Sequence, residues 1–405
     1  MEQVQFDSLF EIPTKNGLSR PSRVRGSGYK MINMGELFAN DRIYDIPMEL
    51  VPMNEKEKLI NDIREDDLLF ARQSLVLSGA GKCSIVKEVK EYTTFESHLI
   101  RVRLNKEIAD PNYYYYYFKS PYSPIKSIVQ QCAQSGIRAS ELATLKVCYI
   151  SLEQQRKIAG ILSAYDDLIE NNRRQIKLLE EAAQKLYKEW FVKLNFPGHE
   201  NVKIVDGVPE GWIKTDINSV CNKINAGGTP NRKKSEYWNN KDIKWFKTKE
   251  LQDCWLYDSE EYISQKGLEN SSAKIFPRNT ILMAIYASPT LGRLGILTKE
   301  ACCNQAALCL IANEEIISYQ WLYLKLMELR DYFNSVARGA GQQNISADVV
   351  KNKTILLPTK SLLDNFTKII GPYFDKIKSL QNQIQLLQSA RDKLLPTLMK
   401  GDIDV

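Results

Sequence analysis

The side chains that most often carry out chemistry are sparse in this sequence of 405 residues. It contains only two histidines, His98 and His199, so catalysis by a histidine base has almost no material to draw on. Its eight cysteines include no C-x-x-C pair, which argues against a zinc site and indicates buried thiols in a reducing cytoplasm. These residues favour a binding protein over an enzyme.

Two segments come close to catalytic motifs without completing them. SGAGKCS (78–84) resembles a phosphate-binding loop, but Val76 stands where the first glycine belongs and Cys83 where Ser or Thr would bind magnesium. EVK (88–90) has the shape of half a nuclease site, and no Asn/Asp-Pro-Pro-Tyr element for methyl transfer is present. We treat both matches as coincidence and expect neither a catalytic residue nor a metal site.

Several loops offer the chemistry of nucleic-acid binding instead. Arg and Lys neutralise phosphates, glycine lets the backbone approach closely, and Gln, Asn and Arg bind base edges. The net charge of +6 includes no basic tail, so local clusters on folded surfaces must bind any polyanion. A charge run is more often simply a solvated face, and the candidates gain weight because they occur at matching places in both halves of the chain. The candidate DNA-binding residues are Arg23, Arg25, Arg72, Lys82, Gln134 and Arg138 in the first half, and Gly228, Thr229, Asn231, Arg232, Lys233, Lys234, Arg338, Gln342, Gln343 and Asn344 in the second.

These halves are related by an internal repeat with a shift of 208 residues. The segment that begins at Ile137 aligns without a gap to the segment that begins at Ile345, for roughly fifty residues. Upstream, GKCSIV (81–86) resembles GRLGIL (292–297) at a slightly different offset. The repeat predicts two copies of one unit, each a globular domain followed by a long helix.

Each copy ends in a heptad pattern typical of a coiled coil. From Ile158 the apolar positions recur in alternating steps of four and three, and the second copy has the same spacing. Ser151 and Gln154 form a capping box at the start of the first helix, and Pro197-Gly198 ends it. The expected interface residues are Ile158, Leu162, Tyr165, Ile169, Ile176, Leu179 and Leu186 in the first helix, and Ile370, Tyr373, Ile377, Leu380, Ile384, Leu387 and Leu394 in the second.

One such helix alone would fit a core helix equally well, but two helices with matching register favour a pair. An antiparallel pair fits best, because the second domain then leaves and re-enters at one point. It predicts a spacer of roughly 48 Å between the domains, with a pseudo-twofold axis. Asn172 and Arg391 interrupt the seam, and single polar seam residues commonly fix register. Gly371-Pro372 should bend the second helix or split off its first two turns, and Pro396 should limit its end.

The elements together predict an α+β fold, with two similar α/β globular domains separated by an antiparallel two-helix coiled coil. We place the first domain at residues 1–150, its helix at 151–195, the second domain at 196–358, and the second helix with a C-terminal tail at 359–405. Hydrophobic residues make up 43% and charged residues 26%, no apolar run reaches the ~18 residues of a membrane helix, and the N-terminus lacks the pattern of a signal peptide. We therefore expect a cytoplasmic protein.

The aromatic run PNYYYYYFKS (111–120) invites comparison with base-stacking surfaces. It aligns with SYQWLYLKL (318–326), so that Tyr115 matches Trp321. A helix packed inside the domain explains both copies, and we favour that interpretation over base stacking.

The sequence closely resembles the specificity (S) subunits of type I restriction-modification systems. The resemblance lies in SLEQQRKIAGILSAYDDLIENNRRQIKLLEEAAQKLYKEWF (151–191), in AGGTPNRKKSEYWNNKDIKWF (226–246) and in the terminus LLPTLMKGDIDV. It implies that each globular domain is a target recognition domain that reads one half of a split, asymmetric DNA sequence. It also implies that the helices set the gap between the half-sites and dock two modification subunits.

By the same resemblance, this chain has no catalytic residue and no cofactor of its own. S-adenosylmethionine would bind the methylase subunits, and ATP and magnesium would bind a separate restriction motor-nuclease subunit. The second helix lacks the E-Q-x-x-I-A run that follows Leu152, so the two methylases need not dock equally.

Two other classes of function stay open on the residues alone. A DNA-modifying enzyme with an unrecognised site would modify DNA as an isolated chain. A coiled-coil scaffold without DNA specificity would give no sequence-specific footprint even when it is assembled with its partners.

Overall fold

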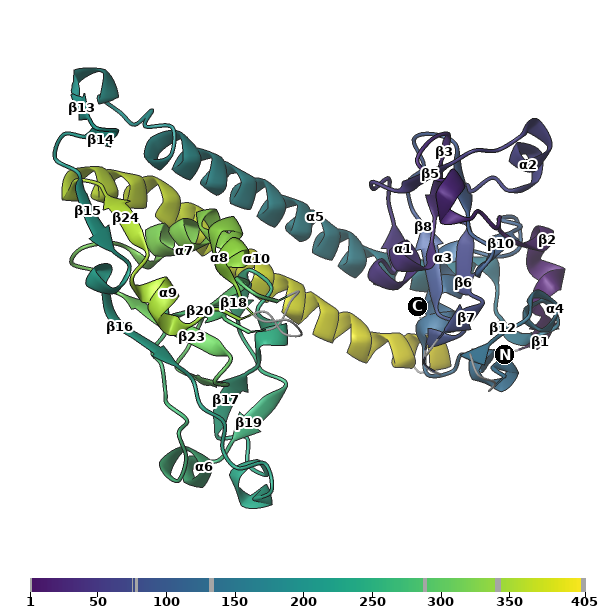
Figure 1. Ribbon diagram of the computed structural model, residues 1–405. Coiled ribbons are helices and arrows are strands. Elements are labelled where there is room, and N and C mark those ends of the chain that lie inside the picture. Colours follow the sequence, from purple (N-terminus) through teal and green to yellow (C-terminus); the bar gives the residue numbers. More distant parts are fainter. Residues whose placement is uncertain are drawn as a thin grey trace. The chain divides into compact units, whose positions relative to one another are not determined.

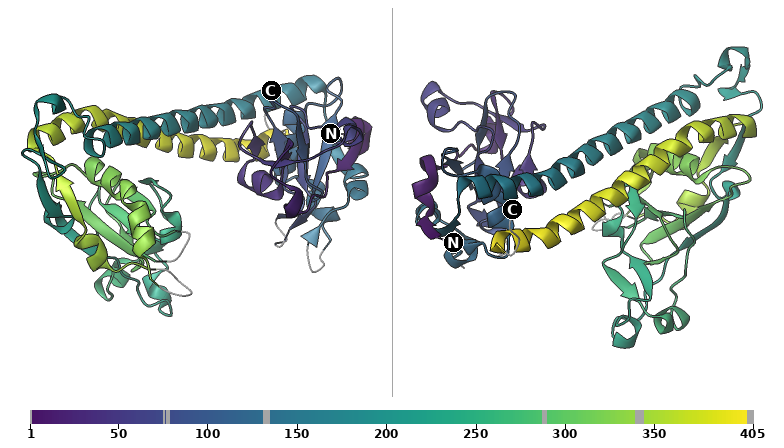
Figure 2. Two further views of the ribbon diagram at one scale, coloured as in Figure 1. Left: turned by 45° about the horizontal axis from the view of Figure 1, so that its top comes forward. Right: turned by 180° about the vertical axis from the view of Figure 1, so that it is seen from behind.

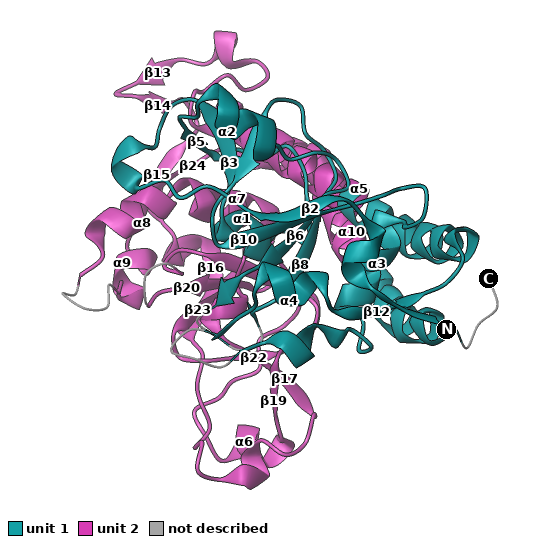
Figure 3. Cartoon of the chain, turned by 90° about the vertical axis from the view of Figure 1, so that its right-hand side faces the viewer, with its two compact units in different colours: residues 1–170, 386–405 teal, residues 171–385 magenta. Residues whose placement is uncertain are grey.

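The structure of the chain is a computed structural model that describes residues 2–74, 76, 79–130, 135–286, 290–338 and 344–401. It divides into two compact units, unit 1 with residues 1–170 and 386–405, and unit 2 with residues 171–385 (Figure 3). Two long helices, α5 (Leu152–Phe191) and α10 (Lys360–Lys400), contribute a stretch to each unit. Among the described helices, none combines the length and the apolar character that crossing a lipid bilayer requires.

Both units contain the same sheet topology (Figure 1). The five-stranded sheet of unit 1 has the order β2 (Phe10–Asn16), β10 (Leu99–Leu104), β6 (Leu68–Ala71), β8 (Cys83–Val86) and β4 (Arg42–Ile43). That of unit 2 has the order β16 (Cys221–Ala226), β23 (Ala307–Ala312), β20 (Ile281–Ala284), β21 (Leu294–Leu297) and β18 (Cys254–Leu256). In each sheet the first four strands are antiparallel and the last pairs in parallel. The repeat in the sequence is therefore a repeat of the fold.

The smaller sheets also correspond between the two units. Unit 1 has a three-stranded sheet of β5 (Glu49–Val51), β3 (Tyr29–Ile32) and β9 (Thr93–Phe95), and unit 2 has one of β19 (Glu261–Ile263), β17 (Ile243–Phe246) and β22 (Cys302–Cys303). The pairs β1 (Glu2–Gln5) with β12 (Lys146–Tyr149), and β15 (Ile213–Asp216) with β24 (Thr354–Leu357), also correspond. Further pairs are β7 (Gln73–Ser74) with β11 (Ser135–Gly136) and β13 (Ile204–Val205) with β14 (Val208–Pro209). The short helices are α1 (Met34–Ala39), α2 (Glu55–Ile60), α4 (Ala139–Ala143), α6 (Gln265–Glu269), α8 (Arg330–Val336) and α9 (Ala347–Lys351).

Apolar runs become strands that are buried on both faces. All four residues of β6, of β8, of β20 and of β21 are buried. β10 has two arginines in its run, and both are buried because carboxylates from the loop between α2 and β6 meet them. Arg103 binds Asp67 through two hydrogen bonds of 2.7 Å, which compensates the cost of burying both charges.

The aromatic run forms a core helix, α3 (Pro111–Lys119). Asp110 caps the helix by accepting a hydrogen bond from the Tyr113 amide (2.9 Å), and every side chain from Tyr113 to Phe118 is buried. Its counterpart in unit 2 is α7 (Tyr319–Glu328), where Trp321 is 1% exposed. The expected packing role is confirmed, since these rings have no free face for bases.

In unit 2 the C-terminal half of α5 packs against the N-terminal half of α10 (Figure 2). Near the end of α5, Trp190 contacts Phe366 of α10. About five turns earlier in α5, the Asn172 amide donates a hydrogen bond of 3.3 Å to Gln383 of α10. Later residues of α5 face earlier residues of α10, so the pair is antiparallel, as the heptad pattern predicts. The seam shares one apolar core with α7 and with strands β20, β21 and β23.

In unit 1 the start of α5 packs against the end of α10. Ser151 accepts a hydrogen bond from the Gln154 amide (3.3 Å), which confirms the helix start. Ile158 and Leu162 of α5 share a core with Leu398 of α10 and with the tyrosines of α3. Here too each helix is bound to the other and to the sheet domain through one core.

The expected seam residues lie as follows. Ile158, Leu162, Ile169, Ile176, Ile370, Ile377 and Leu380 are buried, and Tyr165, Leu179, Leu186, Tyr373, Ile384, Leu387 and Leu394 are half-buried. The pattern missed Tyr187 (2% exposed) and Phe374 (4% exposed), which lie one position beyond seam residues. They are buried because the sheet domain covers a second side of each helix, which widens the apolar stripe beyond a two-helix seam.

The expected splitting of the second helix at Gly371-Pro372 does not occur. α10 continues through Gly371-Pro372 and through Pro396 as far as Lys400. A proline removes one backbone donor and crowds the carbonyl of the preceding turn, but the flanking residues Ile370 and Phe374 are anchored in the apolar core. Tertiary packing thus outweighs the local cost.

Unit 2 also partly buries one acid of the helix pair. Glu180 of α5 lines a cavity of about 360 Å³ with Trp255, Tyr323 and Phe374 among its walls. Burial, together with the nearby carboxylates of Asp253 and Glu181, raises the pKa of Glu180 to about 7.

We therefore expect Glu180→Gln to stabilise the protein at alkaline pH. The folded state holds this proton more tightly than the unfolded chain, whose pKa stays near the ordinary 4.5, so the free energy of unfolding falls as pH rises through 7. Glutamine escapes this loss, and after allowance for solvent screening the gain at pH 8 is roughly 1–2 kcal/mol. Denaturant unfolding at pH 5 and pH 8 measures it. Glu107→Gln, which removes an exposed carboxylate far from Glu180 in the sequence, is the control. An equal gain for Glu180→Gln at both pH values would contradict the assignment.

Candidate nucleic-acid interface

Four chain segments meet at one end of the five-stranded sheet of unit 1. The Leu18 amide donates a hydrogen bond to the Phe95 carbonyl (2.8 Å), and the Arg72 amide donates to the His98 carbonyl (2.8 Å). The Ile137 amide in turn donates to the Arg72 carbonyl (2.9 Å). These bonds bring together the loop that follows β2, the turn between β9 and β10, the end of β6 and the loop before α4. We call this group of segments the loop ladder.

Unit 2 contains the same loop ladder. The Gly228 amide donates to the Cys303 carbonyl (2.9 Å), and the Ile285 amide donates to the Ala306 carbonyl (2.9 Å). The Ile345 amide then donates to the Ile285 carbonyl (3.0 Å). The predicted residues before Arg138 and around Asn344 thus occupy equivalent places, as the shift of 208 residues requires.

Gly228 is a packing residue of this ladder. A Cβ atom at this position would lie 2.2 Å from the Ser272 carbonyl oxygen, so no other residue fits without a backbone shift. Its own carbonyl accepts a hydrogen bond from the Trp245 indole (2.9 Å). Gly228 therefore holds the neighbouring Thr229, whose hydroxyl donates to Gln305, at the edge of the ladder.

Arg232 is held on the surface of unit 2 by two tryptophans and an acid. Its guanidinium lies 3.8 Å from the ring centroid of Trp238 and 4.7 Å from that of Trp245, and it forms an ion pair with Glu261. Burial alone would raise the pKa of the Glu261 carboxyl, but Lys247 and Arg232 lower it overall. The Arg232 guanidinium therefore stabilises the loop 229–238 through contacts within the domain.

The other residues of this loop differ in how far they are bound. Asn231 accepts a hydrogen bond from the Lys233 amide (3.0 Å), which closes a turn. Lys234 donates to the Tyr237 hydroxyl (3.0 Å), and this bond raises the pKa of Lys234. The Lys233 side chain is exposed, and its ammonium has no hydrogen-bond or ion-pair partner among the described residues.

In unit 1 several predicted cations also have internal partners. Arg25 forms an ion pair with Glu49 (2.6 Å) and donates to the Arg20 carbonyl (2.8 Å). Arg72 donates to the Ser97 carbonyl (3.4 Å). Lys82 donates to the Phe38 carbonyl (2.8 Å) and lies 3.3 Å from the carboxylate of Asp41.

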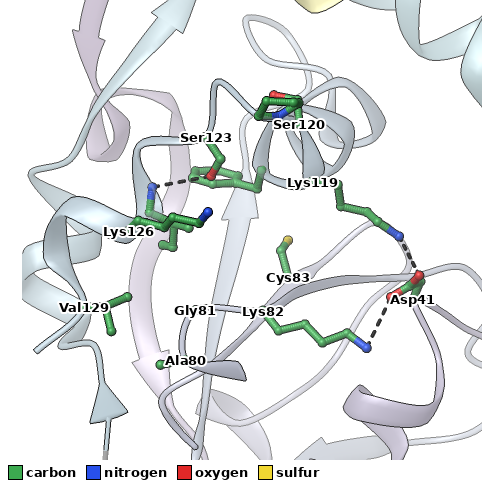
Figure 4. A pocket seen from close by; sticks show the side chains of 13 residues that line it. Asp41, Ala80, Gly81, Lys82, Cys83, Lys119, Ser120, Ser123, Lys126 and Val129 are labelled. Carbon is green, nitrogen blue, oxygen red and sulfur yellow. Dashed lines mark hydrogen bonds and ion pairs between the residues drawn. The ribbon is translucent and has the colours of Figure 1, made fainter. Parts of the chain in front are cut away.

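Lys82 and Asp41 line a cavity of about 1030 Å³ in unit 1 (Figure 4). Lys119 lies on the same cavity and also binds Asp41 (2.5 Å), with Cys83 between the two lysines. Burial alone would raise the pKa of the Asp41 carboxyl, and Lys119 and Lys82 lower it overall. Lys126 is a third lysine on the wall.

The equivalent place in unit 2 is built differently. Gly81 and Gly292 both have φ of +76°, as the resemblance of their segments predicts. The space where a side chain of Gly81 would begin is occupied by the Ile125 side chain. At Gly292 the same space is occupied by Arg330, which donates hydrogen bonds of 3.0 and 2.5 Å to the carboxylate of Asp253. One backbone thus supports different charges in the two units.

Four of the predicted residues stay available for phosphates or bases through their side chains. Arg23, Arg138, Lys233 and Arg338 are exposed and have no side-chain partner within the ranges that the structure describes. Asn344 is exposed as well, and its backbone pairs with Arg338. Gln134, Gln342 and Gln343 lie outside the described residues.

Sequence reasoning missed the acids that hold these cations. Asp41 and Glu261 are far from their partners in the sequence, and single acids give no motif. Trp238 and Trp245 did carry a signal, since tryptophans close to a loop with an arginine are typical of cation–π contacts. The described residues contain no group of three or more His, Cys, Asp or Glu side chains that would hold a metal ion. What the interface offers is charge, hydrogen bonding and shape.

Comparison with known proteins adds independent information. A family model described as "Type I restriction modification DNA specificity domain" matches residues 1–181 and 209–388. The MjaIX type I restriction enzyme specificity subunit of Methanocaldococcus jannaschii is 26% identical over 347 residues, which are 83% of this chain and 79% of that protein. The HindI specificity subunit of Haemophilus influenzae is 23% identical over 314 residues, 62% of this chain and 67% of that protein.

A solved structure shares the fold. The crystal structure of the type I restriction-modification S subunit from M. genitalium matches with a TM-score of 0.61 and 14% identity. The match covers 98% of this chain and 95% of that chain. The fold of this chain thus occurs in a protein of very different sequence.

The geometry of the loop 229–238 predicts that two adjacent cations differ in their effect on stability. We expect Arg232→Ala to lower the free energy of unfolding by roughly 1–2 kcal/mol, because it removes the stacking on Trp238 and leaves Glu261 without one partner. Lys233→Ala should change it by less than about 0.5 kcal/mol, as is usual for exposed residues. Denaturant unfolding of the two variants and the wild type decides, and equal losses would contradict the structural role of Arg232.

Proposed function

Since the chain belongs to the type I restriction modification DNA specificity family, we propose that its two loop ladders each read one half of a bipartite, asymmetric DNA sequence. The observation that carries this proposal is the loop ladder itself. It occurs twice on one topology. Exposed Arg side chains flank it in unit 1, and exposed Arg, Lys and Asn side chains flank it in unit 2. Two equivalent scaffolds with different polar loops suit a site whose halves differ in sequence.

In this proposal the exposed cations bind phosphates and the amide loops read bases. Arg23 and Arg138 in unit 1, with Lys233 and Arg338 in unit 2, would neutralise the backbone of the duplex. Asn344 and the undescribed Gln342 and Gln343 would bind base edges in unit 2, and Gln134 would do so in unit 1. Arg232, Arg25 and Lys82 would act mainly by holding their loops in place.

The partners and cofactors follow the same proposal. Specificity subunits of type I systems work in complexes with other restriction-modification subunits and DNA. We propose that α5 and α10 set the gap between the half-sites and dock two modification subunits, in the cytoplasm where the DNA lies. Catalysis would belong to the partners, with S-adenosylmethionine on the modification subunits, and with ATP and magnesium on a restriction motor-nuclease subunit.

Removal of one heptad from each helix tests the spacing role. Residues 171–177 of α5 face residues 379–385 of α10, as the Asn172–Gln383 bond shows, so deletion of both segments keeps the remaining seam in register. Each helix then shortens by roughly 10 Å, or about three base pairs. We expect the preferred gap to shorten by about three base pairs, with both half-sites unchanged.

The readout for the deletion is the set of methylated adenines in a host that carries the complete system. The control is Asn172→Leu with Gln383→Leu, which removes the same polar bond at constant helix length and should keep the gap. An equal loss of modification at every gap length in a folded deletion variant would refute the spacing role.

Two substitutions in unit 2 separate base reading from phosphate binding. Asn344→Ala should relax one half-site by ~1–3 kcal/mol for each lost contact, while Lys233→Ala should weaken all sequences together. Binding of the reconstituted complex to a library of half-site variants at two salt concentrations measures both. An unchanged half-site profile for Asn344→Ala would remove this residue from the reading surface.

A further inference from the structure

Unit 1 contains a buried polar contact that joins three elements. Asp166 of α5 is 5% exposed, and its carboxylate accepts a hydrogen bond of 2.6 Å from the Tyr116 hydroxyl of α3. Its other oxygen accepts a bond from Arg391 of α10, whose side chain is 17% exposed. Arg391 also donates to Asp392 (2.7 Å). We call Tyr116, Asp166 and Arg391 the polar triad.

Unit 2 has apolar residues at the equivalent positions. A shift of 208 residues takes Asp166 to Phe374 and relates Arg391 to Ala183, and the alignment of α3 with α7 takes Tyr116 to Leu322. Phe374, Ala183 and Leu322 are 4%, 2% and 0% exposed, and they belong to one apolar core. An apolar contact is therefore a workable solution on this backbone, and helix pairing does not in itself require the polar triad.

The repeat creates a hazard of wrong pairing between copies of the chain. Because α5 and α10 have the same heptad pattern, the α5 of one copy could pair antiparallel with the α5 of a second copy and still bury an apolar seam. α5 ends at Phe191 and α10 at Lys400, so during synthesis the second helix is completed roughly 10–40 s after the first. In that interval the α5 seam lacks its proper partner.

The polar triad discriminates against both self-pairings. Asp166 faces Arg391, and the residue of α5 equivalent to Arg391 is Ala183, so in an α5–α5 pair the buried carboxylate would meet an alanine. In an α10–α10 pair, Arg391 would meet Phe374 and would keep only Asp392 of its own helix as a partner. An unpaired buried charge is strongly unfavourable, whereas the pair in one chain is compensated. The Asn172–Gln383 hydrogen bond does not discriminate against an α5–α5 pair. In that pair Asn172 would meet Gln175, whose amide can form the same bond.

We infer that the Asp166–Arg391 ion pair is a specificity element that binds α5 to the α10 of its own chain and excludes a second copy of the chain. The ion pair acts because the two helices differ at these positions. It destabilises self-pairing to a greater extent than it stabilises the correct pair. The inference is independent of DNA reading, and the experiment below involves no DNA.

The test uses two full-length copies with different affinity tags, co-expressed in one cell. The key variant, Tyr116→Leu with Asp166→Phe and Arg391→Ala, gives unit 1 the residues of unit 2. We expect it to fold with wild-type helical content, and the fraction of one tagged copy that is captured with the other should rise roughly tenfold or more over wild type. The charge reversal Asp166→Arg with Arg391→Asp keeps the difference between the helices and should leave capture at the wild-type level.

A matched control removes an exposed pair on α10, Lys360→Ala with Asp364→Ala, whose side chains are each 51% exposed, and should leave capture unchanged. A folded triple variant that is captured no more than wild type would overturn the inference. Should the triple variant fail to fold, the neutral pair Asp166→Asn with Arg391→Gln decides. Higher capture for that pair supports the inference, and wild-type capture overturns it.

Discussion

Burial of the seam of α5 is the interaction on which the rest of the structure depends. Trp190 of this helix packs on Phe366 of α10 in unit 2, and Leu162 packs in one core with Leu398 of α10 in unit 1. Each of these cores also contains the inner face of the local sheet and its helix, α7 or α3. A helix stretch and its sheet domain therefore share one core within each unit, and this core connects the sheet that carries the loop ladder to the helices.

The loop ladder explains how one backbone can support loops of different sequence. Its segments are joined by amide–carbonyl bonds at Leu18 and Arg72 in unit 1, and at Gly228 and Ile285 in unit 2, which place no demand on most side chains. The charges nearby are arranged differently in the two units, since Asp41 binds two lysines and Asp253 binds Arg330. Side chains at the ladder can therefore vary without loss of the fold, which is what a reader of changing sequences requires.

Much of the architecture could be predicted from the sequence, because it depends on periodic patterns. The heptads around Ile158 and Ile370 predict two paired helices, and the shift from Ile137 to Ile345 identifies the repeat. The continuity of α10 through Pro372 could not be predicted, because it depends on packing of Ile370 and Phe374 against residues distant in the sequence.

The candidate site was less predictable for the same reason. Clusters of Arg and Lys mark loops, but only the fold shows that Glu261 binds Arg232 while Lys233 has an exposed side chain. Asp166 gave no signal either, since one acid on a charged helix has no pattern of its own. Its importance comes from Arg391, which lies on the other long helix. Pairings between distant residues are set by topology, and local composition does not encode them.

The central claim is that two repeated readers on one pair of helices recognise DNA at a fixed separation. The most direct measurement is hydroxyl-radical footprinting of the assembled complex on a DNA fragment that carries its methylated sequence. The account predicts two protected segments of unrelated sequence separated by a gap of constant length in every recognised site. A single continuous recognition sequence, or half-sites at variable gaps, would contradict it.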